Sequence, residues 1–209
     1  MGHALPSLAA RDYSPSEDQV VRIRGTWADF KRILKMRGDR SLPRISFDGG
    51  VIELMSPSRH HENLKSLIGR LVEVWCLEHE VVFTTLGSWT LEDPSKKRGA
   101  EPDECYVFGD GRGGSERPDL AIEVDWTHGR IDKLDIYRKL GVRELWYWRS
   151  GVLQPYLLRR GRYVPVEQSE VLPGLDLAQL VSFLDRATTS GAVCEYREAL
   201  RGATSKSKS

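Results

Sequence analysis

The sequence predicts an α/β protein of the α+β kind, in which helices flank a central mixed β-sheet. The first observation is the order of segments, because single helical patterns interrupt blocks of short strand-like runs. The second is composition. Hydrophobic residues make up 40% of the 209 positions and include 6 Trp, 7 Tyr and 5 Phe, enough to fill a real core.

The N-terminal segment has no hydrophobic periodicity, and residues 1–22 are therefore predicted to form a flexible arm. A helix is expected over residues 27–37, where apolar positions recur at helical spacing. Thr26 can cap the start of this helix, and Gly38 can end it. The single domain is predicted to cover residues 23–202.

A β-hairpin and a longer helix follow. The runs 44–48 and 51–55 flank a Gly-Gly pair, which is typical of a tight turn between two strands. Ser58 is a plausible N-cap for the next helix, and Glu62 then falls in its first turn, where the backbone dipole favours negative charge.

The remaining elements are shorter, and a Ser- and Lys-rich tail is predicted at residues 203–209. Strands are expected at 81–85, 88–92, 103–108, 120–124, 144–148, 153–158 and 162–166, and helices at 131–140, about 176–186 and 190–201.

Overall charge and cysteine content exclude several classes of protein. The formal net charge of +1 is unlike that of a uniformly basic nucleic-acid coat protein. No apolar run approaches the roughly 20 residues that a membrane span needs, and the N-terminus lacks a secretory signal, so no membrane partner is expected. The three Cys are odd in number and far apart, which favours a reducing, cytoplasmic setting over a disulfide scaffold.

Near-neutrality conceals an acidic block next to a basic one. Residues 101–127 carry eight acidic and two basic side chains, a net charge of −6. Residues 128–162 carry nine basic and three acidic side chains, a net charge of +6. Two solvated faces explain such a pattern in most proteins, whereas the functional interpretation is a cation site beside a surface for polyanions.

No organic cofactor site is predicted. Residues 109–114 match G-x-G-x-x-G, but a strand rather than a helix follows them, so a dinucleotide is not expected there. Cys76 and His79 have metal-like spacing, yet no second pair completes the four ligands of a structural zinc site.

Acidic residues lie at the ends of two predicted strands. Asp103 follows a proline at the start of one strand, and Glu123 and Asp125 share a face at the end of another. Such carboxylates can converge on a hard divalent ion, which can activate water for phosphodiester cleavage. The alternative is a set of surface acids paired with nearby arginines.

Four pieces of the sequence together resemble the restriction-endonuclease family known as Uma-two, a branch of the PD-(D/E)XK nuclease superfamily. They are ISFDGGVIELMSPSRHHE, GAEPDECYVFG, RPDLAIEVDWTHGRIDKLDIYRKLGVRELWYW and VLPGLDL. The resemblance covers about three quarters of the chain, from Pro43 to about Leu200. It implies a restriction-endonuclease-like core and catalysis that depends on Mg²⁺ or Mn²⁺.

The resemblance also assigns roles to individual residues. Asp103 and Glu123 match the two motif acids, and Glu62 resembles an additional metal-assisting glutamate, so these three are the expected metal ligands. Asp125 stands where the superfamily lysine is expected. The resembled family is thought to take this lysine from the following helix, which identifies Lys133 as the fourth catalytic residue.

The predicted function is a metal-dependent endonuclease that hydrolyses phosphodiester bonds, with double-stranded DNA as its partner. Cleavage of two strands usually requires two active sites, which favours a homodimer. The alternatives are a catalytically inactive module that binds nucleic acid or protein, and a metal hydrolase of small phosphate compounds. Candidate nucleic-acid contacts are Lys96, Lys97, Arg98 and Arg130.

Overall fold

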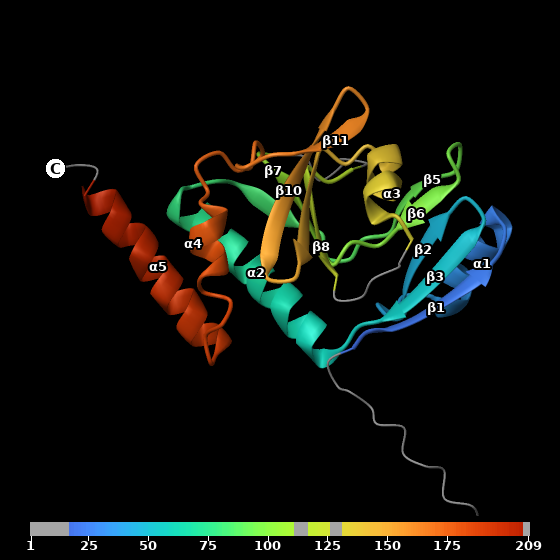
Figure 1. Cartoon of the computed structure of the whole chain (residues 1–209), viewed down its shortest axis with the longest axis horizontal. Coiled ribbons are helices and arrows are strands. Elements are labelled where there is room, and N and C mark those ends of the chain that lie inside the picture. Colours follow the sequence, from blue (N-terminus) through green and yellow to red (C-terminus); the bar gives the residue numbers. More distant parts are fainter. Residues whose placement is uncertain (1–16, 111–116, 126–130, 207–209) are drawn as a thin grey trace, which may run out of the picture.

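The computed structural model describes residues 17–110, 117–125 and 131–206, with side chains described up to residue 202. Two β-sheets with helices packed on them make up the fold, one sheet antiparallel and one mixed. Figure 1 shows the sheets side by side, with the mixed sheet next to the long helix α2 (Arg59–Glu78).

The antiparallel sheet has the strand order β1-β3-β2-β6-β5. Its strands are β1 (Gln19–Arg24), β2 (Arg44–Asp48), β3 (Val51–Ser56), β5 (Leu91–Asp93) and β6 (Arg98–Ala100). Helix α1 (Trp27–Arg37) packs on this sheet through Phe30, which contacts a small apolar cluster. Gly99 is required at this contact, because a Cβ atom there would lie 2.4 Å from the Phe30 ring.

The mixed sheet has the strand order β11-β10-β9-β8-β7-β4. Strands β8 and β9 pair in parallel, and all the other pairs are antiparallel. The strands are β4 (Phe83–Thr85), β7 (Glu104–Phe108), β8 (Leu120–Asp125), β9 (Glu144–Arg149), β10 (Val152–Arg159) and β11 (Arg162–Pro165).

Helices cover both faces of the mixed sheet, so β8 is buried along its whole length. Leu120, Ile122 and Val124 pack against α2 in the main core. The alternate residue Ala121 faces α3 (Lys133–Leu140). Helix α3 is the crossover that parallel pairing of β8 and β9 requires. Glu123 lies on the face of β8 that α3 covers.

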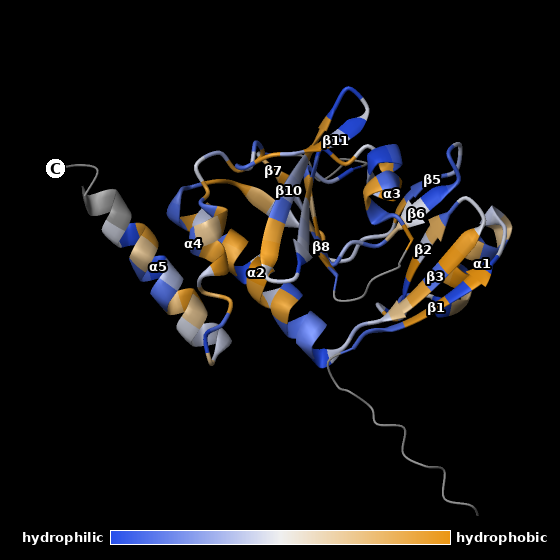
Figure 2. Cartoon of the chain, in the orientation of Figure 1, coloured by the Kyte–Doolittle hydropathy of each residue, from blue (hydrophilic) through white to orange (hydrophobic). Residues whose placement is uncertain are grey.

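The C-terminal helices complete the main core. Helix α4 (Leu177–Val181) and helix α5 (Thr189–Lys206) lie beside α2, as Figure 1 shows. Figure 2 shows hydrophobic and hydrophilic residues alternating along these helices, as expected for amphipathic surface helices. At the end of α2, Glu78 accepts hydrogen bonds from Arg197 and Arg201 of α5.

Several sequence predictions are confirmed at residue level. Thr26 and Ser58 cap α1 and α2, and the α1 cap is a reciprocal capping box with Asp29. The hairpin of β2 and β3 turns at Gly49 and Gly50, both with positive φ. The fold class is confirmed as well, because helices flank a mixed sheet.

Several boundaries differ from the predictions, and strand β6 was not predicted. Residues 19–22 were assigned to the flexible arm, but they belong to β1, which pairs with β3. The predicted strand at 88–92 is displaced to β5, Leu91–Asp93. Helix α5 continues to Lys206, into the predicted tail. The division into arm, domain and tail otherwise stays a prediction.

Candidate active site

Buried polar side chains gather where the two sheets meet. A folded protein rarely buries charged groups unless they are paired, and clusters of this kind occur at functional sites. The cluster contains Asp18, Arg44, Ser46, Glu53, His61, Asp103, Glu123, Asp125 and Lys133, each less than 9% exposed. They come from both sheets, from the first turns of α2 and α3, and from Asp18, which lies just before β1.

Asp103 lies just before β7, next to Glu123 on the neighbouring strand β8. The Asp103 amide donates a 3.1 Å hydrogen bond to the Ile122 carbonyl, and the Asp103 carboxylate accepts a 2.7 Å hydrogen bond from the Val124 amide. Because Ile122 and Val124 flank Glu123 in the sequence, these two hydrogen bonds place Asp103 beside Glu123.

Lys133 reaches the site from the first turn of α3. Its Nζ lies 3.4 Å from Glu123 Oε1 and donates a 2.8 Å hydrogen bond to the hydroxyl of Ser46. The lysine side chain is 5% exposed. The structure therefore brings together the strand acid and the helix lysine that the sequence resemblance pairs.

Tyr137, one turn further along α3, holds the same carboxylate. Its hydroxyl donates a hydrogen bond to Glu123 Oε1. Complete burial and the Glu123 charge raise the pKa of Tyr137 well above its usual value, so its hydroxyl acts as a proton donor in this contact. The Tyr137 ring belongs to the core under α3.

Arg44 on β2 links Asp103 to Glu62. Its guanidinium contacts Asp103 Oδ1, and its Nη2 donates a 2.8 Å hydrogen bond to Glu62 Oε1. Glu62 is 39% exposed and also lies 3.4 Å from Lys65. Glu62 thus lies in the first turn of α2, as expected, but it faces two basic side chains.

His61 connects Asp103 to the residue that precedes β1. Its Nε2 is 3.0 Å from Asp103 Oδ1, and its Nδ1 is 2.9 Å from Asp18 Oδ2. Asp18 Oδ1 also accepts a 2.8 Å hydrogen bond from the Ser58 amide at the start of α2. The contact with Asp18 positions His61 between two carboxylates.

Asp125 is bound to neighbouring strand residues. Its Oδ2 accepts hydrogen bonds from the Tyr147 hydroxyl at 2.9 Å and from Arg149 Nη2 at 2.6 Å. Burial and the charge of Asp125 raise the pKa of Tyr147. The acid at the superfamily lysine position is thus part of a cluster on β8 and β9.

The described residues provide two candidate ligands for a divalent cation. Within the described ranges, no group of three or more His, Cys, Asp or Glu side chains is arranged to hold a metal ion, so Glu62 does not join Asp103 and Glu123 as a third ligand. Arg44 contacts Asp103, and Lys133 contacts Glu123.

Asp103 and Glu123 are both buried, and a buried carboxylate needs a positive charge or hydrogen-bond donors beside it. Carboxylate oxygens are ligands of the kind that Mg²⁺ prefers. The chemistry of Asp103 and Glu123 therefore fits a divalent cation.

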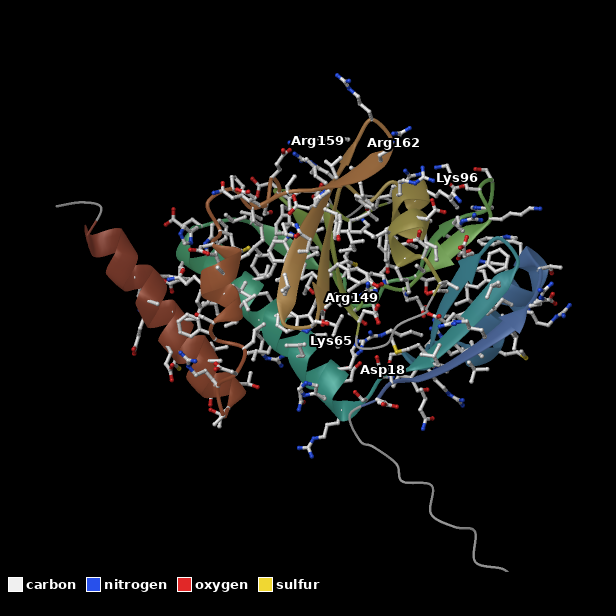
Figure 3. All side chains as sticks on the ribbon, in the orientation of Figure 1. Asp18, Lys65, Lys96, Arg149, Arg159 and Arg162 are labelled. Carbon is white, nitrogen blue, oxygen red and sulfur yellow. The ribbon has the colours of Figure 1, made fainter. Side chains whose placement is uncertain are left out.

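Of the candidate nucleic-acid contacts, Lys96 lies away from this cluster. Lys96 Nζ donates to the Lys139 carbonyl at the C-terminal end of α3, whereas Lys133 is at its N-terminal end. Figure 3 shows Lys96 at the upper edge of the molecule and Asp18, Lys65 and Arg149 on the lower side. Arg98 pairs with Asp48 within the smaller sheet. Arg130 lies outside the described residues.

Sequence reasoning missed Arg44, His61 and Asp18. The available signal was the position of His61 beside Glu62 in the capped first turn of α2.

The α+β fold thus places two buried carboxylates, those of Asp103 and Glu123, near a buried lysine, Lys133. The family model named Uma2, described as "Putative restriction endonuclease", matches residues 27–188. The chain therefore belongs to the Uma2 family of restriction-endonuclease-like proteins.

The chain also resembles a solved structure. A crystal structure described as a "putative nuclease belonging to DUF820" from Anabaena variabilis ATCC 29413 is similar, with a TM-score of 0.49 and 12% identity. The similarity covers 83% of this chain and 99% of that one. Among curated proteins nothing matches. No helix within the described ranges is long and apolar enough to span a membrane.

Proposed function

We propose that this protein is a divalent-metal-dependent endonuclease that hydrolyses phosphodiester bonds in double-stranded DNA. The observation that carries the proposal is the buried contact of Lys133 with Glu123, whose two sequence neighbours on β8 form hydrogen bonds with Asp103. Membership of a nuclease family supports it. A cytoplasmic location and a homodimer with one site for each strand are part of the same proposal.

Asp103 and Glu123 would hold the cation, which when bound lowers the pKa of a water molecule and neutralises charge on the phosphate. Hydrolysis adds a water oxygen to phosphorus, breaks one phosphorus–oxygen ester bond, and leaves a proton on the departing strand-end oxygen. The side chains around the carboxylates supply positioning and positive charge for this reaction.

Each of these side chains has a distinct role in the proposal. Lys133, held by Ser46, is a fixed ammonium that stabilises developing negative charge. The guanidinium of Arg44 can bind phosphate oxygens in a forked geometry. Tyr137 holds Glu123 in place, and His61 does the same for Asp103.

Incubation of the purified protein with supercoiled plasmid and Mg²⁺ or Mn²⁺ tests the proposal. The parent should cut the plasmid, EDTA should stop the reaction, and Asp103→Asn and Glu123→Gln should each reduce the rate by at least about 100-fold. Glu198→Gln on the exposed face of α5 is the matched control and should cut as the parent does. Equal cutting by Asp103→Asn and the parent would refute the assignment.

A non-catalytic binding module is the second candidate. The contact of Arg44 with Asp103 favours it, since a guanidinium already neutralises one proposed ligand. Such a module would bind DNA or a protein in EDTA and cut nothing with either metal. A hydrolase of small phosphate compounds would cleave a nitrophenyl phosphodiester and leave the plasmid intact.

A further inference from the structure

A cavity of about 630 Å³ lies between the C-terminal end of α1 and the outer edge of the mixed sheet. This volume is within the range of small-molecule sites in proteins. Its lining includes Arg37, Arg40, Leu86, Trp89, Glu101 and Val107. None of the four proposed catalytic residues lines it.

Trp89 and Arg40 offer binding groups in this cavity. Trp89 is 37% exposed, and within the described ranges its side chain makes no hydrogen bond and its ring contacts no other ring. Arg40 is exposed, and its guanidinium has no partner in the described part of the chain. An aromatic surface and a guanidinium in one cavity match the two parts of a nucleotide, its base and its phosphate.

The opposite wall is fixed by internal contacts. The Glu101 carboxylate accepts hydrogen bonds from Arg37, from the Thr90 hydroxyl and, at 2.8 Å, from the Ile45 amide. Arg37 and Glu101 neutralise one another, and of the two remaining charged lining residues, Asp39 and Arg40, it is Arg40 that supplies a positive charge. Because these contacts hold the wall in place, a ligand would meet a preformed surface.

Glu101 also ties the cavity to the candidate active site. It stands two residues before Asp103, so their Cα atoms are at most about 7 Å apart. The amide that it binds belongs to Ile45, next to Arg44, which contacts Asp103. A strand with its scissile phosphate at Asp103 would therefore have a neighbouring nucleotide within reach of the cavity.

We propose that this cavity binds one nucleotide, with its base stacked on Trp89 and its phosphate contacted by Arg40. The inference rests on the proposed function in taking that nucleotide to be part of the substrate strand. A free mononucleotide has the same chemistry, and the experiment distinguishes the two sources. Such a subsite would hold an unpaired nucleotide near the cleavage position.

Fluorescence anisotropy with a short labelled single-stranded oligonucleotide in EDTA tests the inference without cleavage. Trp89→Ala should weaken binding about tenfold or more, whereas Trp89→Phe, which keeps a stacking ring, should stay within about threefold of the parent. Arg40→Ala should weaken binding and reduce the salt slope by about 1. Arg24→Ala, an exposed charge on β1, is the matched control and should bind as the parent does.

Deoxyadenosine monophosphate distinguishes the two sources. Quenching of tryptophan fluorescence that is lost in Trp89→Phe, with affinity equal to that for the oligonucleotide, would identify a free nucleotide as the ligand. Binding at least about tenfold weaker than that of the oligonucleotide would identify the strand. Circular dichroism melting of each variant checks its folding, and Arg40→Ala, a surface change, keeps the test available if Trp89→Ala unfolds.

Failure of the nucleotide site and failure of the proposed function give different results. Plasmid cutting, with oligonucleotide affinity unchanged in Trp89→Ala and Arg40→Ala, would overturn the nucleotide site and leave the nuclease intact. Binding that depends on Trp89, in a protein that does not cut the plasmid, would support the nucleotide site and overturn the proposed nuclease function. A parent that binds neither oligonucleotide nor mononucleotide also overturns the inference.

Discussion

Lys133 Nζ lies 3.4 Å from Glu123 Oε1, although the lysine is on helix α3 and the glutamate is on the strand that precedes it. The parallel crossover from β8 through α3 to β9 makes this possible, because it sets the first turn of the helix over the end of the strand. A lysine on the helix thus contacts the strand acid, whereas position 125 of the same strand holds an acid that binds Tyr147 and Arg149.

Removal of one partner of this buried pair should be costly. Lys133→Met leaves the Glu123 carboxylate with the Tyr137 hydroxyl and without its cation, and should lower the free energy of unfolding by about 3–5 kcal/mol. The double variant Lys133→Met/Glu123→Gln removes both charges and should recover most of this loss. Urea unfolding measures both effects.

The control for the Lys133 variant is Lys35→Met, an exposed lysine on α1, which should change stability by less than about 0.5 kcal/mol. A double variant as unstable as Lys133→Met would mean that packing of the lysine stem, and not its pairing with Glu123, explains the loss.

The contact between Asp18 and His61 should stabilise the segment before β1. Asp18→Ala removes the acceptor of both His61 Nδ1 and the Ser58 amide, and buried groups left unsatisfied cost about 1–3 kcal/mol each. Thermal unfolding should therefore show a clear loss of stability, whereas Glu17→Ala next to it, which is exposed, should behave as the parent. Equal stability of both variants would contradict the contact.

Because Glu78 of α2 pairs with Arg197 and Arg201 of α5, the protein should lose stability in acid. Hydrogen bonds from Arg201 and then from Arg197 lower the pKa of Glu78 from 4.5 to about 2. A carboxyl with a lowered folded-state pKa stabilises the fold above its unfolded value, and that stabilisation disappears as the pH falls from 4.5 towards 2.

Glu78→Gln should therefore be less stable than the parent at neutral pH, and the two should converge in acid. Urea unfolding at neutral pH and near pH 3 measures this, with Glu198→Gln as the exposed control. A constant difference between the parent and Glu78→Gln at both pH values would exclude the ion pairs as its source.

The reactivity of the three cysteine thiols should show which of them are buried. Burial raises the pKa of the Cys76 and Cys105 thiols to about 12, whereas Cys194 is exposed. Because the thiolate is the reactive form, a disulfide reagent should modify Cys194 rapidly in the folded protein and the other two only after unfolding. Cys194→Ser should abolish the fast phase. A fast phase that survives this change would show that a buried thiol is accessible.

The sequence predicted the elements that depend on local signals. The Thr26 cap and the Gly-Gly turn are such signals, because neighbouring residues determine both structures. Strand β1 was missed since it lies at the edge of its sheet and five of its six residues are exposed, which leaves no alternating hydrophobic pattern.

The candidate site could be predicted only in part for a similar reason. Asp103, Glu123 and Lys133 belong to motifs that resemblance can align. Arg44 and His61 reach Asp103 from residues about 40–60 positions earlier in the chain. These contacts form only when distant segments of the chain pack together. The short-range pattern of the sequence therefore cannot predict them.

Calorimetric titration of Mn²⁺ into the metal-free protein tests most directly whether the buried acidic cluster holds a divalent cation. If Asp103 and Glu123 hold the cation, Mn²⁺ should bind the parent saturably. Binding should weaken at least about tenfold in Glu123→Gln and in Asp103→Asn, and Glu198→Gln should bind as the parent does. Equal Mn²⁺ affinity in the parent and Glu123→Gln, or no binding to the parent at all, would contradict it.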